Sequence, residues 1–137
     1  MLTNKAKYAL RAMRHLALEY GNGPISITTI SGACNIPKRF LENILIELRR
    51  AELVESSRGK AGGYTLSRAP QTITYADVIR EIDGPLAWAG CASKRFYKRC
   101  EDCPDEQTCI IRPVLIQLRD ATADILESVH LDAPLHS

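Results

Sequence analysis

The sequence predicts a mainly α protein with a small β-hairpin wing: a winged helix-turn-helix plus a long C-terminal dimerisation helix. Three observations predict this class. A short and a longer amphipathic segment meet at a break near Asn35, as in a helix-turn-helix. Two β-capable segments joined by "GKAGG" follow directly, as a wing would. A long apolar stripe at helical spacing then occupies residues 110–129.

Composition limits the class of protein further. The chain has 137 residues, of which 45% are hydrophobic and 25% charged, as is typical of a globular protein with a modest core. No apolar run approaches the ~20 residues that span a bilayer. The first residues, "MLTNKAKYALRAMRHLALEY", lack the apolar core and the cleavage site of a signal peptide. We therefore expect a cytoplasmic protein without a membrane partner.

The charge is divided unevenly along the chain. Residues 1–70 contain 11 basic and 5 acidic side chains, a net charge of +6, whereas residues 71–137 have a net charge of −4. Such asymmetry indicates a basic surface for an anionic partner, most often nucleic acid, although solvated helices give the same totals. The positions of the charges decide between the two.

The first half contains the expected helix-turn-helix. Thr3 is the candidate N-cap of a first helix, which Gly21 ends. Ser26 caps a short helix, and Asn35 marks the break after it. Pro37 falls in the first turn of a stronger helix, where its missing N–H is harmless. The apolar stripe of this helix consists of Phe40, Leu41, Ile44, Leu45 and Leu48.

A β-hairpin comes next. Residues 53–58 and 64–67 are short β-capable segments, and the glycines between them permit positive φ and close backbone approach. The tip of this wing is basic, with Arg58 and Lys60. The charges of the first half therefore lie on the two elements that meet DNA in a winged helix.

The second half contains two more helices. Thr74 and Asp77 form a capping box before a helix that Gly84 ends. Thr108 is the candidate cap of the last helix, with Pro113 early in it. Its stripe of apolar residues either packs on its own domain or forms a dimer seam, and we favour the seam because proteins with one short recognition helix usually dimerise. The tail from residue 130 is expected to fray. We predict three regions: a DNA-binding domain (1–84), a cysteine-rich cofactor and sensor loop (85–108), and a dimerisation helix with its tail (109–137).

Nine side chains are candidates for DNA contacts. Lys38 and Arg39 lie at the end of the second helix that enters the major groove, and Arg39 has the geometry to pair with guanine. Glu42 either accepts a hydrogen bond from cytosine or is a solvated or salt-bridged residue. Contacts to phosphate are expected of Thr28, Thr29, Arg49, Arg50, Arg58 and Lys60.

Four of the five cysteines follow in the spacing C-x8-C-x2-C-x5-C: Cys91, Cys100, Cys103 and Cys109. Thiolates are soft ligands that suit an iron–sulfur cluster or zinc, and a dithiol that closes on oxidation is a third interpretation. Cys109 is expected at the start of the last helix, where the macrodipole favours its thiolate. Cys34 stands apart and is interpreted as a buried small hydrophobe.

The segments "NKAKYALRAMRHLA", "IPKRFLENILIELRRAELVESSRGKAGGYTLSR" and "ITYADVIREIDGP", followed by a cysteine loop, resemble the IscR/NsrR-type winged-helix transcription regulators over nearly the whole chain. The most specific part is the wing motif R-G-x-x-G-G-Y. The resemblance implies a homodimer that binds palindromic promoter DNA, and a [2Fe-2S] or [4Fe-4S] cluster. It also implies that Glu42 tunes the choice of DNA site and that Arg58 is the family's wing arginine.

The resemblance also suggests the cluster ligands. Cys91, Cys103 and Cys109 match the family's three cysteines, whereas Cys100 is additional. Arg112 stands where the IscR branch has a histidine ligand. Cys100 is therefore our candidate for the fourth ligand, the alternative being a residue of the partner subunit.

From these observations we expect a sequence-specific DNA-binding transcription regulator, a repressor, whose DNA affinity is controlled by a cluster in the loop. The alternative is a winged-helix regulator or protein–protein adaptor with a zinc site or a dithiol switch in that loop. An enzyme is not expected, because the sequence has no catalytic triad, paired carboxylates or phosphate-loop signature.

Overall fold

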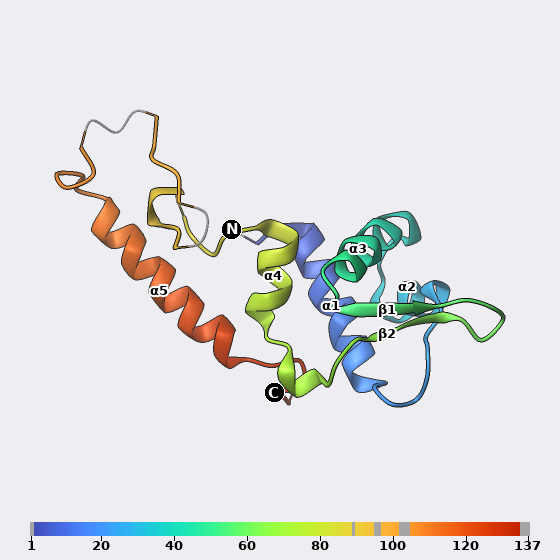
Figure 1. Cartoon of the computed structure of the whole chain (residues 1–137). Coiled ribbons are helices and arrows are strands. Elements are labelled where there is room, and N and C mark those ends of the chain that lie inside the picture. Colours follow the sequence, from blue (N-terminus) through green and yellow to red (C-terminus); the bar gives the residue numbers. More distant parts are fainter. Residues whose placement is uncertain (1, 89, 95–96, 102–104, 135–137) are drawn as a thin grey trace.

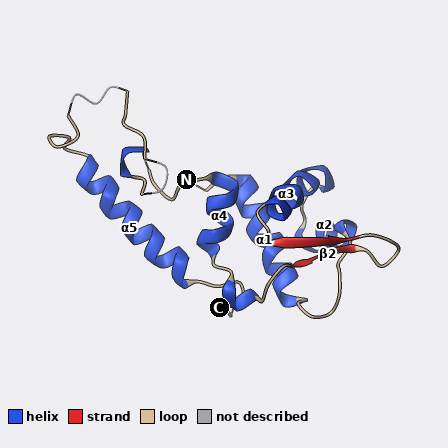
Figure 2. Cartoon of the chain, viewed as in Figure 1, coloured by secondary structure: helices blue, strands red, loops and turns tan. Residues whose placement is uncertain are grey.

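The structure is a computed structural model that describes residues 2–88, 90–94, 97–101 and 105–134. Figures 1 and 2 show its mainly helical architecture with one hairpin. The elements are α1 (Asn4–Leu18), α2 (Ile27–Cys34), α3 (Lys38–Arg50), β1 (Val54–Ser57), β2 (Gly63–Leu66), η1 (Pro70–Thr72), α4 (Tyr75–Asp83), η2 (Gly90–Ala92) and α5 (Arg112–Ser128). Within the described ranges, no helix is long and apolar enough to cross a membrane.

The predicted caps begin three of the helices. The Thr3 side chain accepts a hydrogen bond from the amide of Ala6 at the start of α1. At α2, Ser26 accepts one from the amide of Thr29. Thr74 and Asp77 form the expected capping box at α4. Local hydrogen bonding therefore determines where these helices start.

The turn between α2 and α3 places the two helices against α1. Asn35 has a φ of 54° and ends α2 in the left-handed conformation that Asn tolerates. The α3 side chains that face the core are Leu41, Ile44, Leu45 and Leu48. Phe40 was wrongly predicted to belong to this stripe, because it is 46% exposed and lies under the Arg39 guanidinium, 5.0 Å from the ring centre.

The hairpin is antiparallel, in a register that runs from Val54 opposite Leu66 to Ser57 opposite Gly63. Ile25 continues this sheet, since its amide and carbonyl both bond to Tyr64, at 3.0 and 2.8 Å. A Cβ at Gly63 would lie 2.2 Å from the carbonyl oxygen of Ile25. Glycine is therefore required there, and it brings the wing against the segment that enters α2.

One core holds α1 to α4 and the hairpin together. Its fully buried side chains include Met13, Leu16, Ile30, Ile36, Leu41, Ile44, Leu45, Leu48, Ile73 and Val78. Leu131 joins the same core with none of its surface exposed, although it lies beyond the last helix. The C-terminal segment is thus part of the winged domain.

Backbone hydrogen bonds fix this returning segment, so the prediction of a frayed tail was wrong for residues 130–133, whereas residues 135–137 lie outside the described residues. The amide of Tyr75 donates to Val129 (2.9 Å), and the amide of Leu131 donates to Ile73 (3.0 Å). The Arg14 guanidinium donates to the carbonyl of Leu131 at 2.8 Å. Apolar burial and these three bonds together anchor residues 129–131.

The last helix differs from the others because it contributes no buried residue. It contacts α4 and η2, and Figure 1 shows it running along the side of the molecule away from the hairpin. It starts at Arg112 with Ile111 as its cap, so the prediction of Thr108 as the cap was wrong. A helix from Thr108 would place Pro113 where an intrahelical N–H is needed, whereas the observed start puts it in the first turn.

We predict that Leu131→Ala lowers the free energy of unfolding by about 2–5 kcal/mol, because it removes a fully buried side chain from the common core. Urea unfolding at fixed protein concentration measures this loss. Leu18→Ala is the matched control, since Leu18 is 66% exposed and its truncation should leave the midpoint nearly unchanged. Equal midpoints for both variants would mean that the returning segment does not stabilise the core.

Candidate nucleic-acid interface and cysteine site

The outer face of α3 presents the predicted recognition residues. Besides Phe40, the exposed side chains of α3 are Lys38, Arg39, Glu42, Asn43, Ile46, Arg49 and Arg50. They lie opposite the buried leucine and isoleucine face, as the 3.6-residue period requires. The structure therefore leaves every α3 residue predicted to contact DNA accessible to a partner.

Ile46 was missed in the sequence analysis. It is 38% exposed, one turn after Glu42 and in the middle of the polar face. An exposed apolar side chain among charged ones suits contact with a thymine methyl group. The helical period could have identified Ile46, because it places this residue on the polar side of α3 although isoleucine usually lies in the core.

The N-terminus of α2 carries Thr28 and Thr29, and both are exposed. The Thr29 hydroxyl lies 2.9 Å from that of Ser26, within hydrogen-bond distance. Thr29 therefore takes part in the cap. Its backbone and the Thr28 hydroxyl lie at the positive end of the helix, which favours phosphate.

The wing carries Arg58 and Lys60 at its exposed tip. Gly59 turns the chain there with a φ of 98°. A guanidinium nitrogen of Arg49 donates to the Ser56 hydroxyl at 3.2 Å and so joins the end of α3 to β1. In Figure 1, α2, α3 and the hairpin lie on one side of the molecule, and α5 lies on the other.

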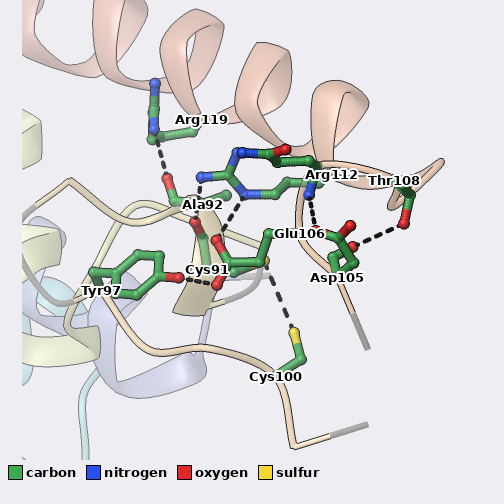
Figure 3. A network of polar contacts seen from close by, with 10 residues as sticks. Cys91, Ala92, Tyr97, Cys100, Asp105, Glu106, Thr108, Arg112 and Arg119 are labelled. Atoms are coloured by element: carbon green, nitrogen blue, oxygen red, sulfur yellow. Dashed lines mark hydrogen bonds and ion pairs between the residues drawn. The ribbon is translucent and has the colours of Figure 1, made fainter. Parts of the chain in front are cut away.

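The cysteine site lies on the α5 side of the molecule. Cys91 is on η2 and is 5% exposed, and Cys100 is half-buried. Their Sγ atoms are 3.8 Å apart. Figure 3 draws this contact as a dashed line. The Gly90 carbonyl accepts from the amides of both Ser93 (3.1 Å) and Lys98 (3.0 Å), and this closes the loop between the two cysteines.

Two arginines of α5 hold the turn that carries Cys91. Arg112 donates to the carbonyl of Cys91 at 3.2 Å, and Arg119 donates to that of Ala92 at 2.8 Å. Figure 3 shows both side chains reaching from the helix to this turn. From the sequence, Arg112 was noted only as the residue that replaces a histidine ligand. Its role in holding the backbone depends on a contact between distant residues that spacing does not reveal.

An acid completes this network. Glu106 accepts a hydrogen bond from the Tyr97 hydroxyl, and its second oxygen lies 3.7 Å from Nε of Arg112. Nearby, Lys94 lies 3.8 Å from a carboxylate oxygen of Asp120 on α5. Lys94 and Tyr97, in the loop between Cys91 and Cys100, are therefore bound to α5 and to the segment just before it.

The remaining cysteines are placed differently. Cys103 lies outside the described residues. Cys109 is half-buried and lies three residues before Arg112, the first residue of α5, so the prediction that it lies at the start of that helix was wrong. Cys34 is half-buried, its Sγ donates to the Arg11 carbonyl at 3.6 Å, and burial raises its pKa while the Arg11 charge lowers it in part.

The described part of the chain thus brings together two of the four predicted ligands, Cys91 and Cys100, and it contains no group of three or more potential metal ligands. Two thiolates on one tetrahedral ion, each about 2.3 Å from the metal, lie about 3.8 Å apart. The Sγ separation in the structure matches this spacing. The pair therefore fits a soft metal centre in which one ion takes both sulfurs.

Comparison with known proteins gives the same family from sequence and from structure. The chain matches the model of the Rrf2 family, described as an iron-dependent transcriptional regulator, over residues 2–135. It is 40% identical to an rrf2-like HTH-type transcriptional regulator of Rhodobacter capsulatus, over 96% of this chain and 90% of that protein.

Solved structures agree. CymR, the global cysteine regulator of B. subtilis, has a TM-score of 0.78 and 33% identity over 96% of this chain and 93% of that one. T. potens IscR has a TM-score of 0.74 and 28% identity over 96% of this chain and 82% of that one. The winged-helix fold and the regulator class are therefore confirmed. This chain belongs to the Rrf2 family of DNA-binding helix-turn-helix transcriptional regulators.

Proposed function

We propose that this protein is a homodimeric repressor that binds palindromic double-stranded promoter DNA under the control of an iron–sulfur cluster. The proposed ligands are Cys91, Cys100, Cys103 and Cys109. One observation carries the proposal: the Cys91 and Cys100 sulfurs lie 3.8 Å apart on a turn that is hydrogen-bonded to α5. The iron-dependent description of the family supports the same metal.

The DNA-binding part of the proposal assigns a role to each exposed residue. Lys38, Arg39, Glu42 and Ile46 contact base edges, since they occupy the N-terminal and middle part of the outer face of α3. Contacts to phosphate come from Thr28, Thr29, Arg49, Arg50, Arg58 and Lys60, which surround that face. These basic contacts fix the register of the protein on the duplex and make binding depend on salt.

The dimer is supported by the apolar face of α5. Ile111 is 65% exposed, Val114 55%, Leu118 38% and Ile125 63%. With Ala121 they recur at alternating spacings of three and four residues, as in the seam of a coiled coil. Pairing this face with that of a second copy buries it and gives the twofold symmetry that a palindromic site requires.

The cysteine site is placed to affect that pairing. A bound cluster would supply a labile, redox-sensitive group that ties the loop sulfurs together. In this chain, Arg112 and Arg119 connect the Cys91 turn to α5, which carries the seam. A change in loop order therefore reaches the relative placement of the two recognition helices. A 100-fold change in DNA affinity needs a coupling free energy of only ~2.7 kcal/mol.

Zinc is the second candidate, because the 3.8 Å sulfur separation suits a tetrahedral zinc ion equally well. A regulator with structural zinc would bind DNA without responding to iron. A winged-helix adaptor with such a site would bind DNA weakly and without sequence preference.

The cluster prediction is tested on protein purified without oxygen. We expect a coloured preparation with iron and acid-labile sulfide, and loss of the visible bands in Cys91→Ser and Cys100→Ser, because each variant removes a proposed ligand. Cys34→Ser is the control and should keep the spectrum, since Cys34 is bonded to Arg11 instead. Colourless protein with stoichiometric zinc would contradict the cluster.

The wing prediction concerns the salt dependence of DNA binding. We expect Lys60→Ala to weaken binding to all sequences alike and to reduce the slope of log affinity against log salt by about 0.9, because it removes one phosphate contact. Titrations of labelled duplex at several salt concentrations measure both. Lys94→Ala removes the same charge on the α5 side of the molecule and should leave the slope unchanged.

The seam prediction concerns assembly. Leu118→Asp places a charge in the middle of the apolar face of α5, so we expect monomers in analytical ultracentrifugation and loss of high-affinity binding to a palindromic duplex. Asp124→Asn removes one charge from the same helix, outside the seam spacing, and should leave the dimer intact. A Leu118→Asp protein that still sediments as a dimer would place the interface elsewhere.

A further inference from the structure

We propose that Cys91 and Cys100 form an oxidisable dithiol in the metal-free protein, which a hydroperoxide converts into an intramolecular disulfide. Formation of the disulfide does not depend on the proposed cluster. Its consequence for cluster loading rests on the proposed function. The two Sγ atoms are already 3.8 Å apart in the structure, close enough for an S–S bond to form after a small movement.

The loop geometry holds the two sulfurs in this position. Because the Gly90 carbonyl accepts from the amide of Lys98, the chain returns beside η2 just before Cys100. A Cβ at Gly90 would lie 2.9 Å from both the Cβ and the carbonyl oxygen of Lys98. The absence of a side chain at Gly90 therefore permits the close approach that brings Cys100 to Cys91.

The backbone at Cys91 is also held by two arginines of α5. Arg112 and Arg119 fix the carbonyls of Cys91 and Ala92. An S–S bond of about 2.05 Å requires the sulfurs to approach by less than ~2 Å, which side-chain rotation supplies.

The difference in burial sets the order of the two chemical steps. Cys100 is half-buried whereas Cys91 is 5% exposed, so the peroxide reaches Cys100 first. The Cys100 thiolate attacks the O–O bond and becomes a sulfenic acid while an alkoxide leaves and takes up the thiol proton as an alcohol. The Cys91 thiol then attacks this sulfur, the S–S bond forms, and water leaves. Two thiols thus lose two electrons, which reduce one hydroperoxide to an alcohol and water.

This disulfide would prevent the loop from binding a metal centre. It consumes two of the soft ligands proposed for the cluster, so the oxidised protein cannot load a metal centre until a thiol reductant reopens the bond. Loss of metal followed by peroxide exposure therefore leaves a state distinct from the reduced apo protein.

The experiment uses the full-length chain, freed of metal with a chelator and treated with a small excess of hydrogen peroxide. Remaining thiols are alkylated, and the unreduced protein is digested with trypsin and analysed by mass spectrometry. Cleavage after Lys94, Lys98 and Arg99 separates the Cys91 peptide from the Cys100 peptide, so a disulfide appears as a linked pair that reductant removes. We expect this linked pair in the wild type.

Variants assign the second sulfur, because the Cys100 peptide also contains Cys103 and Cys109. Cys100→Ser should abolish the linked pair, whereas Cys103→Ser and Cys109→Ser should keep it. Gly90→Ala should reduce its yield by pushing the Lys98 segment away. Gly32→Ala is the matched control and should keep the yield, since a Cβ there meets nothing within 4 Å.

Two results would overturn the inference. One is a linked pair that persists in Cys100→Ser. The other is wild-type protein in which Cys100 is oxidised to sulfinic acid while Cys91 stays reduced. Failure of the cluster proposal appears separately, in the visible spectrum of protein that has never met oxygen.

Discussion

The return of the chain after α5 is the constraint on which the arrangement of this molecule depends. Leu131 is fully buried among residues of the first four helices. Its amide donates a hydrogen bond to the carbonyl of Ile73, and its carbonyl accepts one from the Arg14 guanidinium. Besides this anchor, α5 contacts α4, and Arg80 of α4 pairs with Glu127 at 2.6 Å, a partly exposed ion pair that stabilises little by itself. The anchor therefore fixes the position of α5, although α5 itself contributes no buried residue.

The N-terminal half of α5 contacts the turn that carries Cys91. Arg112 and Arg119 use backbone carbonyls as acceptors, so they hold the Cys91 turn whatever occupies the sulfurs. The helix is therefore hydrogen-bonded to the cysteine turn near one end and followed directly by the segment anchored in the core at the other. The exposed apolar residues of α5 lie along the same helix. The residues that hold the cysteine turn and the face proposed for dimer contact therefore belong to one element.

Short-range physics explains what could be predicted from the sequence. The caps at Thr3, Ser26 and Thr74 depend on neighbours three residues away, and the hairpin was predicted from two short β-capable segments joined by a glycine-rich turn. The errors arose where distant contacts or competing local rules decide. The buried Leu131 and the bonds from Arg112 join residues that no local pattern relates, whereas the proximity of Cys91 and Cys100 was expected from their spacing in one loop. The start of α5 was misplaced because the cap signal at Thr108 was given more weight than the constraint from Pro113.

The bond between Arg49 and Ser56 has a consequence for how such a molecule evolves. Together with the close approach of Gly63 to Ile25, it makes the recognition helix, the helix before it and the wing a single body. Under the proposed function, a perturbation at the cysteines would move this body as a whole without reshaping its outer surface. Sequence drift in the cysteine loop should then alter which spacer length between half-sites is tolerated and leave the preferred bases of each half-site untouched.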